Sequence, residues 1–273
     1  MHIDSIIELN NGIPIPRLGL GMYQTPDGSV ARHAVSYALE VGYRHIDTAM
    51  MYGNEASVGQ AVRESGLPRE EVFVTTKLWN DDHGYDEAIS AFHRSLEALD
   101  LEYIDLYLIH WPVEGKRSDS WRALEDVYEE GLCRAIGVSN YMTWHLDELL
   151  ASCRVRPAVN QVEFSPFLYL TDLLEQCRRE EVLLEAYSPL TKGKKLDDER
   201  LTAIAAELGR SPAQVLIRWA LQHDLVVIPK SARPEHILSN VDVFDFSIST
   251  EQMEHMNDLN EDLRTSWDPS KQH

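Results

Sequence analysis

Short apolar runs alternate with amphipathic segments along the whole chain. Runs such as 104–109 (IDLYLI) and 225–228 (LVVI) are largely unbroken by polar residues, which is typical of parallel strands covered on both faces. Segments of helical periodicity lie between the runs, for example at residues 30–41, 55–65 and 85–99. The pattern predicts strands at residues 17–22, 43–49, 72–78, 104–110, 134–139, 158–164, 182–188 and 225–230.

This alternation favours an α/β fold, the closed (β/α)8 TIM barrel, because each of the eight strands is followed by a helical segment. Helix start signals support it at Asn54 and at Ser211-Pro212. Such barrels use about 250 residues, so residues 1–273 are expected to form a single domain. Residues 6–15 contain an Asn-Gly pair and predict a β-hairpin, which we expect to close the barrel floor.

An open, doubly wound sheet is the alternative to the barrel. It would bind a dinucleotide through the G-x-G-x-x-G fingerprint at the first strand. Gly19-Leu20-Gly21 begins like this fingerprint, but position 24 is Gln and no helix follows directly. The barrel is therefore the preferred prediction.

The charge balance excludes some classes of ligand. The chain has 25 Lys and Arg against 45 Asp and Glu, a formal net charge of −20, which disfavours nucleic acids and anionic membranes as partners. An anionic ligand would need a local basic cluster. The sequence shows no membrane span, no secretory signal and no cysteine spacing typical of disulfides or metal sites. We expect a cytoplasmic protein with no metal and no obligate protein partner.

Polar side chains gather where the predicted strands end. Asp47, Lys77 and His110 end the second, third and fourth strands, and Tyr52 follows Asp47 closely. Barrel enzymes build their active sites at this carboxyl end. Each residue alone could have a purely structural role, since an Asp at a strand end often caps a turn and a Lys is often solvated. The interpretation as an active site therefore depends on all of these residues meeting at one end of the barrel. The later strands contribute Asn140, Gln161, Tyr187, Ser188 and Lys230 in the same way.

Six segments in register resemble the aldo-keto reductase superfamily, in particular its short-loop microbial aldehyde and ketone reductases of the 2,5-diketo-gluconate reductase type. They span most of the chain, from about Gly19 to Asn240. The segments are 42–49 (GYRHIDTA), 52–55 (YGNE), 76–79 (TKLW), 108–112 (LIHWP), 136–140 (IGVSN) and 228–231 (IPKS). The resemblance implies a (β/α)8 barrel and the NAD(P)H-dependent reduction of aldehydes and ketones to alcohols.

The same resemblance implies a catalytic tetrad of Asp47, Tyr52, Lys77 and His110. Reduction needs a hydride at carbon, which the nicotinamide supplies, and a proton at oxygen. An ammonium about 4 Å from the phenol of Tyr52 favours phenolate by about 4 kcal/mol at an effective dielectric near 20, so Lys77 is expected to lower the Tyr52 pKa. Asp47 would keep Lys77 charged, and His110 would donate a hydrogen bond to the substrate oxygen.

The resemblance also implies a cofactor site. Tyr187 is expected to stack on the nicotinamide, and 188–195, with three lysines, to lie over the pyrophosphate. Arg and Lys suit a 2′-phosphate, but His236 stands where strongly NADP-dependent members carry Arg. NADP(H) is therefore predicted to be preferred, with NAD(H) accepted. The expected cofactor contacts are Gly21, Met22, Ser139, Asn140, Gln161, Tyr187, Ser188, Leu190, Lys230, Ser231, Arg233, His236 and Asn240.

Tyr23, Trp79, His110 and Trp111 are the expected substrate contacts by the same resemblance. The short segment 113–118 and the short tail beyond Leu263 predict an open pocket with broad selection of small carbonyl compounds. Two rival functions stay open. One is a Schiff-base aldolase that would use an unprotonated Lys77 as the nucleophile, and the other is a non-catalytic dinucleotide-binding subunit.

Overall fold

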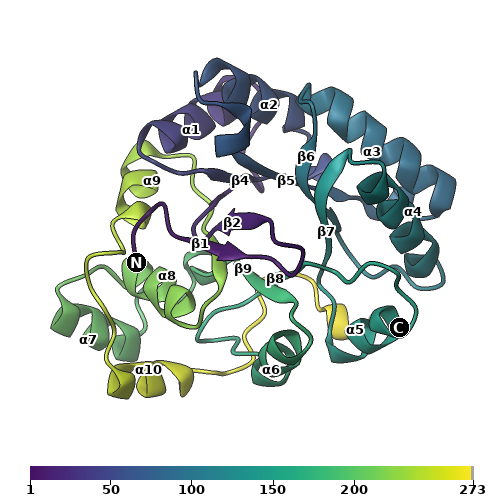
Figure 1. Ribbon diagram of the computed structural model, residues 1–273. Coiled ribbons are helices and arrows are strands. Elements are labelled where there is room, and N and C mark those ends of the chain that lie inside the picture. The colour runs from purple at the N-terminus through teal and green to yellow at the C-terminus, as the bar shows by residue number, and fades with distance from the viewer. Residues whose placement is uncertain (272–273) are drawn as a thin grey trace.

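The chain begins with an antiparallel hairpin of β1 (Ile6–Glu8) and β2 (Pro14–Pro16) in the computed structural model, which describes residues 1–271 (Figure 1). Gly12 takes a left-handed φ of 82° in the turn, as the Asn-Gly pair predicts. The side chains of Asn10 and Asn11 donate hydrogen bonds to the carbonyls of Pro157 and Arg134. These bonds fasten the hairpin where β7 (Cys133–Ser139) and β8 (Val159–Glu163) begin, so the predicted closure of the barrel floor is confirmed.

Eight parallel strands form the barrel, in the order β10-β9-β8-β7-β6-β5-β4-β3. Parallel bridges from Leu18 to Val227 and from Gly21 to Lys230 join the first strand to the last and close the ring. Every predicted strand is present, although several are shorter than the apolar runs suggest. Their bounds are β3 (Leu20–Gly21), β4 (His45–Asp47), β5 (Phe73–Leu78), β6 (Ile104–Ile109), β7 (Cys133–Ser139), β8 (Val159–Glu163), β9 (Leu183–Tyr187) and β10 (Val226–Ile228).

Helices surround the barrel and connect successive strands (Figure 1). Ser211 caps α8 as predicted, in a reciprocal box with Gln214. Asn54 precedes α2 without capping it, because its Oδ1, the atom that would accept from the helix, accepts from the Thr48 hydroxyl at 2.6 Å. Its NH2 group donates to the carbonyls of Met22 and Thr25. The helices are α1 (Ser29–Glu40), α2 (Glu55–Glu64), α3 (Tyr85–Leu99), α4 (Arg117–Glu129), α5 (Thr143–Leu150), α6 (Thr171–Arg179), α7 (Glu199–Leu208), α8 (Pro212–Gln222), α9 (Pro234–Val241) and α10 (Thr250–Asn257).

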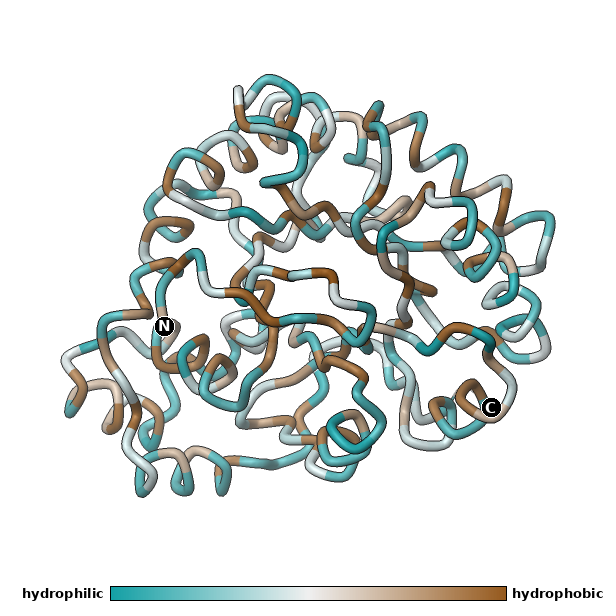
Figure 2. Tube along the Cα trace, in the orientation of Figure 1, coloured by the Kyte–Doolittle hydropathy of each residue, from teal (hydrophilic) through white to brown (hydrophobic). Residues whose placement is uncertain are grey.

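The apolar core has two layers. Side chains that face outward from the strands pack against the helices, whereas a smaller inner cluster fills the barrel. Ile15 from the hairpin joins Leu106, Leu108 and Val159 in that inner cluster. Figure 2 shows the apolar residues concentrated along the strands and on the inner helix faces. Within residues 1–271, no helix is long and apolar enough to cross a membrane.

Candidate active site

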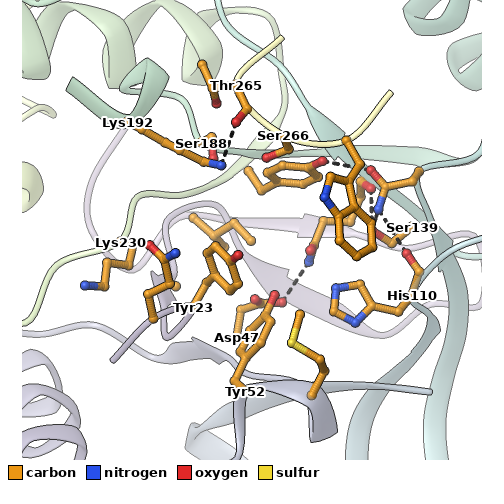
Figure 3. A pocket seen from close by; sticks show the side chains of 18 of the residues that line it. Tyr23, Asp47, Tyr52, His110, Ser139, Ser188, Lys192, Lys230, Thr265 and Ser266 are labelled. Atoms are coloured by element: carbon orange, nitrogen blue, oxygen red, sulfur yellow. Dashed lines mark hydrogen bonds between the residues drawn. The ribbon is translucent and has the colours of Figure 1, made fainter. Parts of the chain in front are cut away.

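A cavity of about 520 Å³ opens at the carboxyl end of the barrel (Figure 3). Its walls come from the loops after the strands and from the C-terminal tail. All four residues of the expected tetrad belong to the cavity or lie directly beneath it. The lining residues are Gly21, Tyr23, Gln24, Asp47, Met51, Tyr52, Trp79, His110, Trp111, Ser139, Asn140, Gln161, Tyr187, Ser188, Pro189, Leu190, Lys192, Ile228, Lys230, Thr265, Ser266 and Trp267.

A buried ion pair forms the floor of the cavity. The side chain of Lys77 is fully buried in β5, and its Nζ lies 2.7 Å from Asp47 Oδ1 at the end of β4. The same Nζ donates to the carbonyl of Thr48 at 2.7 Å and to the Tyr52 hydroxyl at 3.4 Å. Tyr52 reaches this position because the short 3-10 helix Met50–Tyr52 follows β4. The structure therefore brings Asp47, Lys77 and Tyr52 together as expected.

The expected lowering of the Tyr52 pKa is wrong for this arrangement. Burial of the phenol raises the pKa of Tyr52 well above its usual value, and the Asp47 charge adds to this effect. Lys77 does not offset it, because Asp47 lies closer to its ammonium group than Tyr52 does. A charge already paired with an opposite charge has a weak net effect on a third group. The phenol is thus protonated at neutral pH.

His110 faces the Tyr52 ring across the cavity floor. Their ring centroids lie 5.7 Å apart at an interplanar angle of 76°. The Trp79 ring packs edge-on against His110, with 5.2 Å between the centroids. Burial, and then the Lys77 charge, hold the pKa of His110 well below its usual range. Asn140 fixes the backbone here by donating to the His110 carbonyl at 2.9 Å. His110 is therefore a neutral imidazole that can donate one hydrogen bond.

Polar side chains of β7 to β9 form one wall. Tyr187 donates from its hydroxyl to Asn140 Oδ1 at 2.8 Å, and Ser139 donates to the Gln161 carbonyl at 2.8 Å. Gln161 Nε2 donates to Asp47 Oδ2 at 2.7 Å, the bond drawn as a dashed line at Asp47 in Figure 3. Hydrogen bonds thus hold the wall residues to one another, and the Gln161 amide links this wall to the ion pair.

The expected adenosine clamp is only partly at the cavity. Lys230 lines it, and Ser231 accepts a hydrogen bond from the Arg233 backbone just before α9. Arg233 and His236 are exposed on the start of α9, outside the lining of the cavity as the described residues form it. Of the three lysines in 192–195, only Lys192 lines the cavity. Met22, Ser231, Asn240, Lys194 and Lys195 likewise lie outside the lining formed by residues 1–271.

The C-terminal tail forms part of the cavity, although its shortness led us to expect no contribution from it there. The tail is short, yet it reaches the cavity and contributes Thr265, Ser266 and Trp267 to the lining. The Trp267 ring lies 5.5 Å from the Trp111 ring and 6.3 Å from the Trp79 ring, between centroids. Lys192 Nζ donates to the Thr265 carbonyl at 2.8 Å, which joins the tail to the loop after β9 (Figure 3).

A buried carboxylate at the end of β8 holds this tail in place. Glu163 Oε1 accepts from the Thr265 backbone at 2.7 Å and from the Thr265 hydroxyl, and Oε2 accepts from the Ser266 backbone at 3.1 Å. Neither Glu163 nor Trp267 was expected at the site. Two signals could have found them: Trp267 is a single Trp in a polar tail, and Glu163 lies at the end of a predicted strand.

The fold and the site together define an α/β-barrel oxidoreductase with a tyrosine, a histidine and a buried Lys–Asp pair at the carboxyl end of the barrel. The chain matches the model of the aldo/keto reductase family over residues 17–261. It belongs to that family, and it reduces carbonyl groups with NAD(P)H.

Individual relatives cover nearly the whole chain. A 9,11-endoperoxide prostaglandin H2 reductase of Trypanosoma cruzi is 50% identical over 266 residues, which is 96% of this chain and 94% of that protein. A glyoxal reductase of Bacillus subtilis is 48% identical over 265 residues, with 97% and 96% covered.

Solved structures are similar over the same extent. An aldo-keto reductase enzyme from a Medee basin deep-sea metagenome library is 43% identical with a TM-score of 0.94, and 98% of this chain and 99% of that chain are covered. A Bombyx mori aldo-keto reductase in complex with NADP is 37% identical with a TM-score of 0.89, and the coverage is 95% and 94%.

Proposed function

We propose that the protein reduces small aldehydes, dicarbonyls and keto compounds with NADP(H), and that Tyr52 donates the proton. The observation that supports this most is the Lys77 ammonium, which contacts both Asp47 and the Tyr52 hydroxyl at the floor of the cavity. The proposal takes residues 1–273 as one barrel domain that needs no metal and no obligate protein partner.

Tyr52 starts the reaction as a phenol and ends it as a phenolate. Its raised pKa keeps the proton in place until a carbonyl oxygen gains negative charge beside it. Lys77, 3.4 Å from the hydroxyl, then stabilises the phenolate that remains. Asp47 pairs with the Lys77 ammonium at 2.7 Å, and neutral His110 donates a hydrogen bond to the substrate oxygen.

The cavity has a donor set that fits a nicotinamide dinucleotide. It combines an aromatic ring, side-chain amides and two lysines along one path. When bound, the dinucleotide supplies the hydride to the carbonyl carbon. Tyr187 would stack on the nicotinamide, and Lys192 and Lys230 would receive phosphate charge. The other contacts proposed are Gly21, Met22, Ser139, Asn140, Gln161, Ser188, Leu190, Ser231, Arg233, His236 and Asn240.

NADP(H) is the proposed preference, with NAD(H) accepted. Lys230 and Arg233 supply positive charge near α9, and His236 is exposed at the first turn of that helix. A neutral histidine contacts a phosphate more weakly than the planar guanidinium of arginine. Discrimination between the two cofactors is therefore expected to stay below about a thousandfold in kcat/KM, or about 4 kcal/mol.

The proposed substrates are small and uncharged, because several aromatic rings line the cavity. They belong to Tyr23, Trp79 and Trp111, together with Trp267 from the tail. The Bacillus subtilis relative supports the same class, since its name specifies glyoxal, a small dicarbonyl. A Schiff-base mechanism is disfavoured, because the Lys77 amine would have to lose its proton while paired with Asp47 at 2.7 Å.

The test is Tyr52→Phe with a panel of aldehydes and ketones, each assayed with NADPH and with NADH. The variant should lose about a hundredfold or more in kcat at saturating NADPH, while NADPH still quenches the tryptophan fluorescence of the cavity. Tyr107→Phe is the matched control, because that buried phenol packs against Phe92 of α3 on the outside of the barrel. Near wild-type turnover by Tyr52→Phe would refute the assignment.

A further inference from the structure

A second carboxyl group lies beneath the cavity, and the proposed mechanism does not use it. Glu185 on β9 has a fully buried side chain, two residues before Tyr187. Its Oε2 accepts a hydrogen bond from Gln161 Nε2 at 3.0 Å, and the same nitrogen donates to Asp47 Oδ2 at 2.7 Å. One side-chain amide therefore joins Glu185 to the carboxylate that pairs with Lys77.

The charges around Glu185 do not balance if both carboxyl groups are ionised. Lys77 is the cation in contact with the cluster, and it pairs with Asp47. His45 Nε2 lies 3.7 Å from Glu185 Oε1, but burial and then the Lys77 charge lower the pKa of His45 to about 3, so the ring is neutral. The remaining group nearby is the Tyr52 phenol, which is uncharged as well.

Glu185 is the group that holds the proton. Its Oε1 is buried and has no hydrogen-bond partner among the described residues, a costly state for an ionised oxygen. Burial, and then the Asp47 charge, raise the pKa of Glu185 to about 8. Burial raises the pKa of Asp47 as well, but the Lys77 charge and the hydrogen bond from Lys77 oppose this effect. We assign the negative charge to Asp47, because Lys77 Nζ contacts its Oδ1 directly at 2.7 Å.

We propose that protonated Glu185 is a positioning residue that holds Gln161 and the Asp47–Lys77 pair in the arrangement used for cofactor binding and proton transfer. The Gln161 NH2 group donates to a carboxyl oxygen of Asp47 and to one of Glu185. The carbonyl of the same amide is therefore left to face the cavity, whose wall includes Gln161. This inference rests on the proposed contact between Gln161 and the nicotinamide carboxamide.

Ionisation of Glu185 disturbs both functions. A second negative charge attracts the Lys77 ammonium away from Tyr52, so less positive charge is available to the phenolate that forms there. It also competes with Asp47 for the Gln161 amide and so weakens the orientation of that side chain. Cofactor affinity and turnover should therefore decline together as the pH rises through about 8.

The experiment compares wild-type enzyme with Glu185→Gln from about pH 6 to pH 9.5. Glutamine reproduces the shape and the neutral charge of the protonated acid and can still accept from Gln161. The dissociation constant of NADPH is read from quenching of tryptophan fluorescence, since Trp79, Trp111 and Trp267 line the cavity. Turnover of a small aldehyde is measured alongside.

Between pH 7 and pH 9 the wild-type NADPH dissociation constant should rise about tenfold, the size expected for the loss of one hydrogen bond between neutral amides. Glu185→Gln should keep its pH 7 affinity within about twofold over that range, and its kcat should decline less steeply. Glu55→Gln serves as the matched control, because Glu55 is a second buried carboxyl that is bonded to Thr76 instead of Gln161. It should keep the alkaline decline of the wild type.

If the NADPH affinity of Glu185→Gln declined at alkaline pH with the same size and midpoint as in the wild type, the proposal would be overturned. A wild-type dissociation constant that did not change with pH would overturn it as well, and that measurement does not depend on the folding of any variant. Glu185→Leu, which lacks the acceptor, should bind NADPH about tenfold more weakly already at pH 7. A failure of the proposed function looks different, since the wild type would then fail to bind NADPH or Tyr52→Phe would retain turnover.

Discussion

At the scale of single residues, the site depends on which carboxyl groups are charged. Asp47 and Glu185 both contact Gln161 Nε2, yet only Asp47 contacts Lys77. One ammonium cannot neutralise two buried carboxylates, and a buried unpaired charge is far more costly than a buried neutral acid. We therefore treat the pair of Asp47 and Lys77 as part of a larger cluster in which Glu185 holds one additional proton.

The stability of the fold should report this proton. The pKa of Glu185 is raised to about 8 in the folded protein, whereas an unfolded glutamate titrates at about 4.3. Between these two values the folded state binds the additional proton, so stability decreases as the pH rises, by up to about 1.4 kcal/mol per pH unit. Glu185→Gln carries no proton to lose and should become progressively more stable than the wild type from pH 5 to pH 8.

Thermal unfolding of the two proteins at a series of pH values measures this difference. Both proteins should have similar unfolding temperatures near pH 5. A constant offset between wild type and Glu185→Gln at every pH would indicate that Glu185 is ionised in the fold and that its carboxylate is stabilised by contacts other than those described.

The sequence was sufficient to predict the residues of the floor and insufficient to predict their protonation. Strand ends are visible in the apolar pattern, so that pattern alone assigns Asp47, Lys77 and His110 to one rim. The Tyr52 pKa was predicted in the wrong direction, because the distances from Lys77 to Asp47 and to Tyr52 decide it. Glu185 was missed, since a lone acid within a strand gives no local signal of its partners.

At the scale of elements, the C-terminal tail acts as part of the barrel rim. Lys192 bonds the tail to the short 3-10 helix Thr191–Gly193, and Glu163 holds it to the end of β8. The two contacts of Thr265 join it to residues 73 and 102 positions earlier in the chain, Lys192 and Glu163. Local patterns cannot predict such pairings, which explains why the strands and helices were predicted well and the contribution of the tail to the cavity was not.

Loss of the Glu163 anchor should weaken substrate binding more than turnover. Glu163→Gln replaces one of the two acceptor oxygens with an NH2 group, so at least one of the backbone bonds to Thr265 and Ser266 is lost. With Trp267 less firmly placed against Trp111, the KM for a small aldehyde should rise about threefold to tenfold, equivalent to about 1 kcal/mol. The measurement is steady-state kinetics at saturating NADPH.

A double-mutant cycle separates this anchoring from a general loss of stability. Trp267→Ala alone should raise the same KM, and adding Glu163→Gln should then have little further effect, because both changes act through one contact. Ser270→Ala, whose hydroxyl bonds Asp268 further along the tail, is the control. Fully additive effects of Glu163→Gln and Trp267→Ala would exclude the anchoring role.

At the scale of the whole molecule, the acidic surface and the basic residues of the site have opposite effects on an anionic cofactor. The net charge is −20, yet two lysines line the cavity and Arg233 lies exposed at the start of α9. Exposed charges interact over about 8–10 Å at moderate salt, so the local cations act on a bound phosphate more strongly than the distant acids do. The excess of acidic residues mainly affects the stability of the folded chain.

Added salt should therefore stabilise the protein. Most of the ion pairs involve at least one exposed partner, such as Arg154 with Glu129 or Arg179 with Glu180, and exposed pairs contribute only about 0–1 kcal/mol each. Salt screens these attractive pairs, which lowers the stability of the fold slightly. It also screens the mutual repulsion of an excess of 20 negative charges, and this second effect is the larger one. The unfolding temperature should rise by several degrees between about 10 mM and 150 mM NaCl at pH 7. KCl should have the same effect at equal ionic strength, whereas a decrease in unfolding temperature would mean that the ion pairs outweigh the net repulsion.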